Sequence, residues 1–138
     1  MALAAARATI EEYKRGAVIE HIWGAGRRFQ EGFRAAAART CASAECLGYP
    51  VHPKIVIRHE SDEARRLLMS LFLQETARRG VIFHHAGFYV SFSHSDADVD
   101  QSLEACEAAL RVVGEAVADG RIAERLEGEP YEVVIRRS

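Results

Sequence analysis

The side chains that could do chemistry in this chain of 138 residues are six histidines, three cysteines and two lysines. Histidine and thiolate groups bind transition metals, histidine also transfers protons, and a lysine amine forms an imine with a carbonyl compound. Each of these chemistries needs several groups at one place. The spacing of the residues therefore decides which of them to expect.

A metal site is the first possibility, because five histidines and two cysteines fall between positions 41 and 94. Structural zinc sites use paired ligands at short, fixed spacings. The pair Cys41 and Cys46 has no second pair, and the neighbours His84 and His85 would point apart in a strand. We therefore predict no metal site, and a small metal-binding protein is only the third alternative for function. The ligands considered are Cys41, Cys46, His52, His59, His84, His85 and His94.

Nucleophilic and cofactor chemistry lack the groups that they need. Cys106 falls on an apolar helical stripe, where a cysteine usually behaves as a small buried hydrophobe. Lys14 belongs to a polar helical stretch and Lys54 follows a proline at the start of a strand. The run Gly24-Ala25-Gly26 lacks the spacing of a dinucleotide or phosphate loop. We predict that this chain alone has no catalytic and no cofactor-binding residue.

The composition argues against several classes of partner. Apolar residues make up 49% of the chain, and the net charge of −2 comes from 18 basic and 20 acidic residues spread along it. There is no basic patch for nucleic acid and no apolar run of roughly 20 residues for a membrane span. The three sparse cysteines indicate free thiols rather than a disulfide framework. We expect a cytoplasmic protein that binds neither nucleic acid nor membranes.

The N-terminal part of the chain favours helix. Between positions 2 and 39 alanine is abundant, proline is absent, and apolar residues recur on one helical face, which predicts one long helix or two. Each glycine inside a helix costs about 1 kcal/mol. Either close packing against another surface or a kink near Gly24 and Gly26 should therefore explain them. The apolar face carries Val18, Ile19, Ile22, Trp23, Phe29 and Phe33.

The middle of the chain alternates between loops and short elements. Positions 40–53 have loop composition, and positions 54–59 alternate as a half-buried strand. A helix should begin after Ser61, a good N-cap, and end before Gly80, which suits a left-handed residue. Two extended pieces, 81–83 and 88–93, should follow, interrupted at 84–87. The helix has a buried stripe of Ala64, Leu67, Leu68, Leu71 and Phe72.

A second capped helix follows the extended pieces. Ser95 with Asp98 three residues later resembles a capping box, so a helix should start there. It should end at Gly120, before a short turn at 122–126 and a last strand at 131–136. Its apolar stripe is Val99, Leu103, Cys106, Leu110, Val113 and Val117.

This order of elements predicts an α+β fold, a two-layer sandwich. We expect a small sheet of three to four strands with helices packed on one face, in addition to the long N-terminal helix. Residues 1–39 would form that helix and residues 40–138 the α+β small domain. Together they would make one compact unit.

The stretch 71–113, LFLQETARRGVIFHHAGFYVSFSHSDADVDQSLEACEAALRVV, resembles the C-terminal region of fold-type I, class III aminotransferases. The resemblance is closest to enzymes of the glutamate-1-semialdehyde aminomutase type. The segment TIEEYKRGAVIEHIWGAGRRFQEGF resembles the helix by which that family's chain leaves its cofactor-binding domain. Two features depart from the family: the loop 84–87 lacks its proline, and positions 88–92 lack a carboxylate-binding arginine. The matching residues are Arg78, Arg79, Gly80, Val81, Ser91, Phe92, Ser93, His94, Ser95, Asp96, Asp98, Val99 and Asp100.

The resemblance implies that the chain is the C-terminal small domain of a cytoplasmic, homodimeric enzyme that depends on pyridoxal phosphate (PLP). The partner would be the large domain, which holds PLP and its lysine, so this chain alone would be inactive. In the intact enzyme His84, His85 and His94 could line the substrate cleft, although His94 is better explained as a residue that orders the turn before its helix. Substrate choice, and amino transfer versus an intramolecular amino shift, would depend on the large domain.

A free-standing interaction module is the alternative function. Without a large domain, an exposed apolar helical face of a few hundred Å² would promote association. We therefore predict self-association through the first helix, on the face that carries Ile19, Ile22, Trp23, Phe29 and Phe33.

Overall fold

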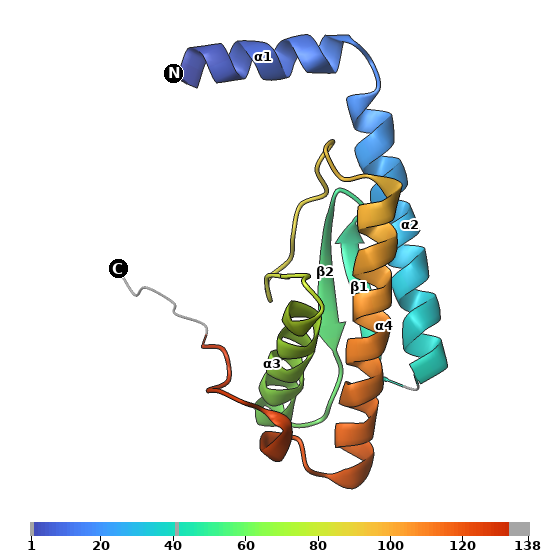
Figure 1. Cartoon of the computed structure of the whole chain (residues 1–138), viewed down its shortest axis with the longest axis vertical. Helices are drawn as coiled ribbons and strands as arrows, with labels where there is room; N and C mark the ends of the chain where they lie inside the picture. The colour runs from blue at the N-terminus through green and yellow to red at the C-terminus, as the bar shows by residue number, and fades with distance from the viewer. Residues whose placement is uncertain (1, 41, 133–138) are drawn as a thin grey trace.

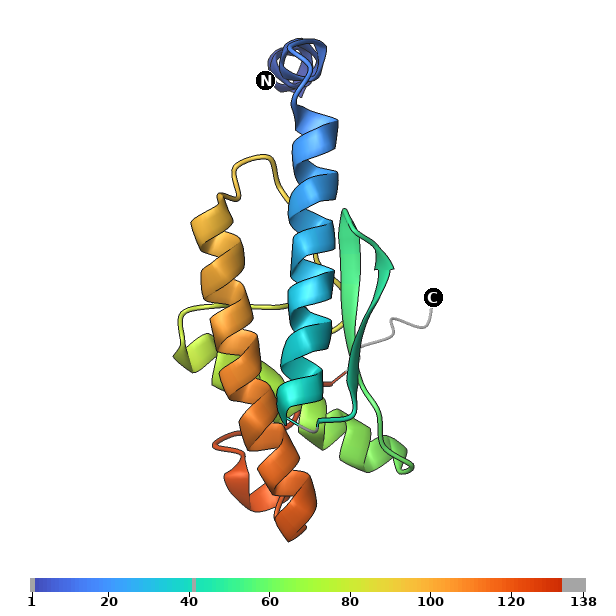
Figure 2. The same ribbon diagram turned by 90° about the vertical axis from the view of Figure 1, so that its right-hand side faces the viewer.

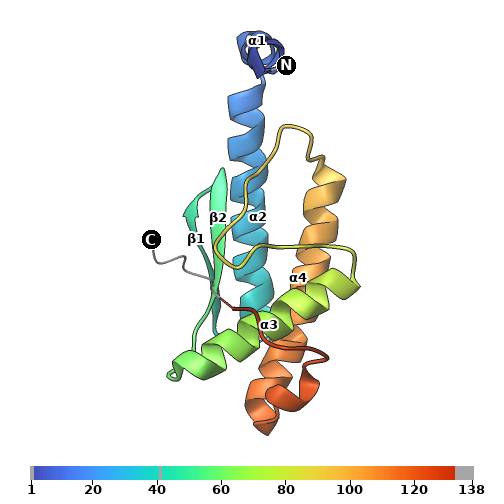
Figure 3. The same ribbon diagram turned by 90° about the vertical axis from the view of Figure 1, so that its left-hand side faces the viewer.

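The computed structural model describes residues 2–40 and 42–132. Its elements are α1 (Ala2–Lys14), α2 (Val18–Thr40), β1 (Ala44–Tyr49), β2 (His52–Ile57), α3 (Asp62–Arg78), α4 (Asp96–Asp119) and the 3-10 turn η1 (Ala123–Arg125). Figure 1 shows α2 and α4 side by side, and Figure 2 shows the hairpin of β1 and β2 on the other side of α2. Helix α3 packs against α4 and β2 (Figure 3). The α+β class is confirmed, but the sheet of the described residues has two strands instead of three or four.

The N-terminal region forms two helices with a break between them. The break includes Gly16, whose φ of +101° lies in the left-handed region that glycine adopts without steric cost. The chain turns there, and α1 projects away from the rest of the molecule (Figure 1). The alternative of a kink near Gly24 and Gly26 is wrong, because α2 passes through both glycines without interruption.

Close packing explains two of the glycines in α2. A Cβ atom on Gly26 would lie 1.9 Å from the carbonyl oxygen of Pro50, between the two strands of the hairpin. A Cβ atom on Gly32 would lie 2.4 Å from the side chain of Leu103 in α4. Glycine therefore lets α2 approach the hairpin on one side and α4 on the other, which makes α2 the central element of the fold.

The loop expected at positions 40–53 contains strand β1, which the sequence did not reveal. It pairs antiparallel with β2, in a register that runs from Ala44 opposite Ile57 to Tyr49 opposite His52. The strand sequence AECLGY contains no β-branched residue, and the turn carries Pro-Val instead of the Asn-Gly or Asp-Gly that marks many hairpins. Strand β2 begins two residues earlier than expected, at His52, and ends at Ile57. Its alternation is confirmed, because Ile55 and Ile57 are buried between exposed or half-buried neighbours.

The segment between α3 and α4 is extended but contains no strand, contrary to the expectation at 81–83 and 88–93. Two backbone hydrogen bonds join it to the neighbourhood of β2: the N–H of Phe88 donates to Pro53 O, and the N–H of Val90 donates to Val51 O, both at 3.1 Å. A turn at 84–87, in which Gly87 has a φ of +124°, separates this contact from the residues before it. The pairing is therefore too short to make a third strand.

The ends of α3 and α4 match the predicted capping signals. Ser61 caps α3 by accepting a backbone N–H, and Gly80 follows the helix with a φ of +80°. Ser95 and Asp98 form the complete capping box of α4, and Gly120 ends that helix with a φ of +70°. The two predicted stripes meet α2 and the hairpin in one core, except that Val117 at the end of the α4 stripe is 46% exposed. The most buried large side chains of the core include Phe33, Leu68, Leu71, Phe72, Cys106, Leu110 and Val113.

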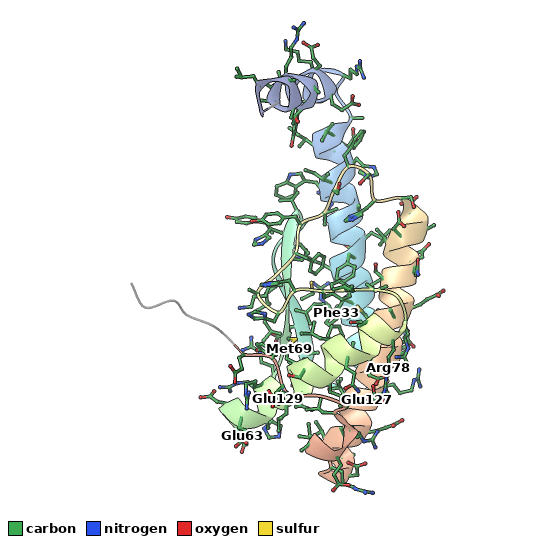
Figure 4. The ribbon with its side chains drawn as sticks, turned by 60° about the vertical axis from the view of Figure 1, so that its left-hand side comes forward. Phe33, Glu63, Met69, Arg78, Glu127 and Glu129 are labelled. Atoms are coloured by element: carbon green, nitrogen blue, oxygen red, sulfur yellow. The ribbon has the colours of Figure 1, made fainter. Side chains whose placement is uncertain are left out.

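The last strand predicted at 131–136 lies mostly outside the described residues, and Tyr131 and Glu132 form no strand. The segment that leads to it is attached to α3. The N–H of Tyr131 donates to Oγ of Ser70 at 3.1 Å. Arg78 of α3 pairs with Glu127, and Figure 4 shows both side chains.

Candidate functional site

The candidate site is a hollow between α2, the extended segment 80–90 and the first turns of α4. Its volume is about 410 Å³. Figure 3 shows the extended segment crossing α2 on its way to the start of α4. Because three separate parts of the chain form the walls, no periodicity in the sequence could have revealed this space.

Three phenylalanines form the apolar wall of the hollow. The ring centroid of Phe29 lies 5.9 Å from that of Phe83 and 5.2 Å from that of Phe88, and the last two are 5.0 Å apart. Tilted and edge-to-face rings at these distances attract one another. The cluster attaches the extended segment to α2 and gives the hollow a side that excludes water.

Polar groups at the start of α4 line another part of the hollow. Asp98 accepts the backbone N–H and the side-chain O–H of Ser95, both at 2.7 Å. These bonds, together with the nearby His94, hold the pKa of Asp98 below its ordinary value, so the carboxylate is ionised at neutral pH. Gln101 and Ser102 add an amide and a hydroxyl to the same wall.

His94 lines this hollow and is held by both its ring and its backbone. Its Nδ1 accepts the N–H of Ser91 at 3.1 Å, and its carbonyl oxygen accepts a hydrogen bond from Nε2 of His21 at 2.8 Å. Because Nδ1 is an acceptor, the neutral ring carries its proton on Nε2. These contacts order the turn before α4, and they leave an N–H donor on the other side of the ring.

The other two predicted cleft residues lie elsewhere. His84 and His85 belong to the turn at 84–87, and His85 lines a second hollow, of about 450 Å³, between β2 and α3. Their rings do not point apart as expected for a strand, but lie with centroids 4.4 Å apart, because the chain turns here. Desolvation, helped by His84 and Lys54, lowers the pKa of His85, which is therefore mainly neutral at pH 7. His85 and His94 thus line different hollows.

The residues around the candidate site do not fit PLP as a bound cofactor. That cofactor requires a lysine for the imine, an acidic partner for the pyridine nitrogen and a cradle for the phosphate. Lys14 is exposed on α1, and Lys54 is exposed on β2, where it lines the second hollow. Neither lysine lines the hollow that contains His94.

The thiols of Cys46 and Cys106 are not activated. Cys106 is fully buried in the core, as the apolar stripe predicted. Burial raises the pKa of Cys46 to about 12 and also raises that of Cys106. A thiol that stays protonated is a poor nucleophile and a poor metal ligand. Both are free thiols, whereas Cys41 lies outside the described residues.

The histidines that were considered as metal ligands are dispersed. The ring of His52 stacks on Tyr89 at 4.2 Å, and Nδ1 of His59 accepts the N–H of Ser61 just before α3. Within residues 2–40 and 42–132, no three side chains of histidine, cysteine, aspartate or glutamate are grouped so that they could hold a metal ion. In the same part of the chain, no helix combines the length and the apolar character needed to cross a bilayer.

Aromatic side chains gather at the end of the molecule where α2 begins and the hairpin turns; Trp23 is half-buried and the others are exposed. Trp23 lies with its ring centroid 6.5 Å from that of Tyr49, which faces His52 across the hairpin, and His52 stacks on Tyr89. Tyr49 is 73% exposed, and Tyr89 is 75% exposed. Sequence analysis missed this cluster as a unit, since only the outward position of Tyr89 could be read from its strand-like alternation. We call the cluster the aromatic end; it consists of Trp23, Tyr49, His52 and Tyr89, with Ile19 one helical turn before Trp23.

Comparison with known proteins gives matches in structure alone. No family model matches the sequence, and no curated protein matches it. The PLP internal aldimine form of the FumI protein from Sphingopyxis sp. MTA144 matches with a TM-score of 0.73 and 23% identity, over 83% of this chain and 27% of that chain.

Two further solved structures are similar over shorter parts of the chain. An omega-transaminase from Sphaerobacter thermophilus matches with a TM-score of 0.62 and 15% identity, over 68% of this chain and 24% of that one. A transaminase with PLP bound matches with a TM-score of 0.61 and 19% identity, over 74% and 24% of the two chains. This chain therefore spans about a quarter of the length of these structures, and it has the fold of that part of PLP-dependent transaminases.

Proposed function

We propose that the chain is the C-terminal small domain of a PLP-dependent aminotransferase of class III, similar to glutamate-1-semialdehyde aminomutase. The observation that carries the proposal is the match of 83% of this chain to 27% of the FumI protein. The sequence motif between positions 71 and 113 supports the same assignment. The imine-forming lysine and the cofactor site would belong to the large domain, and this chain alone would be inactive.

In the intact enzyme, the hollow next to His94 would form one wall of the substrate cleft. Phe29, Phe83 and Phe88 would exclude water from that wall, which strengthens electrostatic contacts inside the cleft. The Nε2–H of His94 would donate a hydrogen bond to an oxygen of the substrate, since Nδ1 is already engaged by Ser91. His85 lines the other hollow and His84 lies against its ring, so the cleft role is best supported for His94.

The large domain would cover α1 and the aromatic end. Isolated helices shorter than roughly 12–15 residues are marginal in water, and α1 has 13 residues that stand apart from the body (Figure 1). Its apolar side chains are exposed: Leu3 is 88%, Ile10 is 54% and Tyr13 is 47% exposed. Contact with another surface would remove this apolar area from water. We further propose that the parent enzyme is a cytoplasmic homodimer.

The experiment that tests the assignment uses antibodies against this chain in cells of its source. We expect the captured material to contain, in the same polypeptide or in a bound one, a PLP-binding domain with a borohydride-reducible lysine imine. Mass spectrometry of the reduced sample identifies the modified lysine. Capture of this chain with no PLP-modified lysine would contradict the proposal.

The predicted inactivity of the isolated chain has a separate test. After incubation with PLP and gel filtration, we expect no stoichiometric imine absorbance in the purified chain. A band that disappears in Lys14→Ala or Lys54→Ala would contradict the proposal, since it would show that the chain carries its own cofactor lysine. A variant with both lysines replaced controls for reaction of PLP with the N-terminal amine.

A free-standing interaction module is the second candidate. Phe29 and Phe33 of the predicted helical face are buried in the core, because α2 packs against the hairpin and α4, so they are not available to a partner. The exposure of Ile19, Tyr49 and Tyr89 at the aromatic end favours this candidate. If no large domain exists, the same surface would pair two copies of the chain. Sedimentation velocity at increasing concentration, combined with the capture experiment, distinguishes a domain of a larger enzyme from a free-standing module that pairs with itself. A strictly monomeric chain, captured alone from cells, would argue against both candidates.

A further inference from the structure

Three histidines of the chain make the same kind of hydrogen bond to the backbone. In each of them Nδ1 accepts a nearby backbone N–H: His59 from Ser61 at 3.2 Å, His84 from Ala86 at 3.2 Å, and His94 from Ser91 at 3.1 Å. Of the three, His94 lines the hollow of the candidate site. The proposed function uses the Nε2 side of this ring and does not use the bond at Nδ1.

The bond at Nδ1 of His94 depends on the charge of the ring. Nδ1 accepts the N–H of Ser91 only in the neutral ring, which carries its own proton on Nε2. When the ring takes a proton from water, Nδ1 becomes a second N–H donor, and the bond to Ser91 is lost. Histidine is the side chain whose ordinary titration falls between pH 5 and pH 8. The bond is therefore present at higher pH and is lost as the pH falls.

A carboxylate of α4 attracts the charged form of this ring. The bonds from Ser95, helped by the charge of His94, keep the pKa of Asp98 below its ordinary value. Asp98 is therefore ionised at pH 5 as well as at pH 7.5, and it stays a fixed negative neighbour while the histidine titrates. Three further charged groups at this helix start form ion pairs with one another: Arg28 of α2 with Asp96 at 2.8 Å and with Asp100 at 2.6 Å.

Two other histidine contacts of the extended segment survive protonation. Nε2 of His21, in α2, donates to the carbonyl oxygen of His94 at 2.8 Å, and a protonated ring still donates this bond. The ring of His52 stacks on Tyr89 with centroids 4.2 Å apart, and a cation is attracted to the face of an aromatic ring. These contacts hold the chain at positions 89 and 94. Loss of the bond to Ser91 therefore frees the residues between them.

We propose that His94 is a pH-dependent switch of the turn at 91–94: the neutral ring closes the turn, and the charged ring opens it and shifts the adjacent wall of the hollow. That wall includes Val90, which directly precedes the turn. Ser91 and His94 are both exposed, so water replaces the lost partner and the change is reversible. An effect on a substrate rests on the proposed function, whereas the opening of the turn is a property of this chain alone.

The test uses NMR spectroscopy of the full chain at a series of pH values. The ring resonances of His94 give its protonation state. Hydrogen exchange of the Ser91 amide, relative to an unstructured peptide at the same pH, reports the bond. We expect this protection to fall about fivefold between pH 7.5 and pH 5, with the midpoint of the ring titration. The amide shift of Val90 should change with the same midpoint.

Two substitutions of His94 separate its charge from its hydrogen bond. His94→Asn offers an acceptor oxygen in place of Nδ1 but does not titrate, so Ser91 should be protected at both pH values. His94→Ala has no acceptor, so Ser91 should be unprotected at both. His59→Asn is the matched control, because it replaces the titrating acceptor in front of α3 and should leave the pH dependence of Ser91 unchanged. Circular dichroism checks that each variant is folded.

Three results would overturn the proposal. Equal protection of Ser91 at pH 7.5 and pH 5 would show that the bond does not depend on the ring. A pH dependence that persists in His94→Ala would assign it to another group. A Val90 shift that does not follow the ring titration would show that the wall of the hollow stays in place. None of these measurements involves the cofactor, so their failure is distinct from failure of the capture experiment that tests the PLP assignment.

Discussion

The two ends of the molecule have opposite surfaces. At the aromatic end, Tyr49 and Tyr89 expose about three quarters of their area, at 73% and 75%. At the far end of α4, Arg125 bridges Glu115 at 3.2 Å and Asp119 at 2.5 Å, and Arg121 of the following turn pairs with Glu124. We call this second region the charged end; it comprises the last turns of α4 and η1.

The difference separates a surface suited to water from one suited to a partner. Ion pairs at the charged end satisfy their charges locally while they stay hydrated, and such pairs add little to stability. Exposed rings at the aromatic end gain free energy only when another surface covers them. A partner of this chain should therefore approach from the side of α1 and the hairpin turn.

The largest effect is expected from disruption of the contact between α2 and the hairpin turn, which lies beneath the aromatic end. Gly26→Ala would place a methyl group 1.9 Å from the Pro50 carbonyl, so α2 and the hairpin must separate. We expect a loss of roughly 3 kcal/mol in the free energy of unfolding. Gly24→Ala is the matched control, because no atom lies within 4 Å of its Cβ position. It should stabilise the protein by up to about 1 kcal/mol, from helix propensity. Urea denaturation measures both, and equal effects would refute the close contact.

The next effect concerns a buried carboxylate in α3. Burial alone would raise the pKa of Glu75, but its bonds to Arg79, Gln74 and Arg78 outweigh burial and lower it. A lowered folded pKa stabilises the protein above the ordinary pKa near 4.5, and this stabilisation is lost as pH falls through the folded pKa. Glu75→Gln should therefore cost roughly 2 kcal/mol at pH 7 and clearly less at pH 3.

The control for this titration is Glu124→Gln, in the exposed pair at the charged end. It should change the free energy of unfolding by less than about 1 kcal/mol at either pH. Urea unfolding curves at both pH values compare the two variants. A cost of Glu75→Gln that stays constant between pH 7 and pH 3 would contradict the lowered pKa.

A smaller effect tests the aromatic end as an interface. Trp23→Ser together with Tyr49→Ser should weaken self-association of the isolated chain by about tenfold or more, since aromatic anchors dominate many interfaces. The free energy of unfolding of the monomer should change by less than about 1 kcal/mol, because both rings are outside the core. Sedimentation equilibrium gives the first quantity and urea denaturation the second. Unchanged self-association would show that the interface lies outside the aromatic end.

The smallest effect belongs to the charged end. Arg125→Ala removes contacts to Glu115 and Asp119, yet the three side chains are substantially hydrated. We expect a loss of less than about 1 kcal/mol and no change in self-association. A loss as large as that of Gly26→Ala would show that the charged end is part of the structural core, and the contrast between the two ends would fail.

Features set by neighbouring residues were predictable. Ser61, Ser95 and Asp98 act within one helical turn, and Gly80 and Gly120 end their helices for a local steric reason, so α3 and α4 follow from the sequence. The stripe of each helix is equally local. The sequence resemblance to class III aminotransferases is strongest at positions 71–113, which include the end of α3 and most of α4.

Features that depend on distant contacts were not predictable. Strand β1 forms because its partner holds it in register, while its own sequence contains no β-branched residue. The same holds for the site: His94 lines one hollow with Phe29 and Phe88 only after α2 and the extended segment pack together. The aromatic end likewise unites Trp23 with Tyr49 and Tyr89 from three separate parts of the chain.

The bend at Gly16 has a mechanical consequence. Because α1 stands apart from the body (Figure 1), rotation about the few dihedral angles around this residue would reorient α1 while the core stays intact. A partner that binds α1 would therefore change its orientation relative to the core by rotation around Gly16. Replacing Gly16 by alanine would restrict backbone rotation at this position and disfavour its left-handed geometry. The angle between α1 and α2, measured by spin labels on the two helices, would report the change.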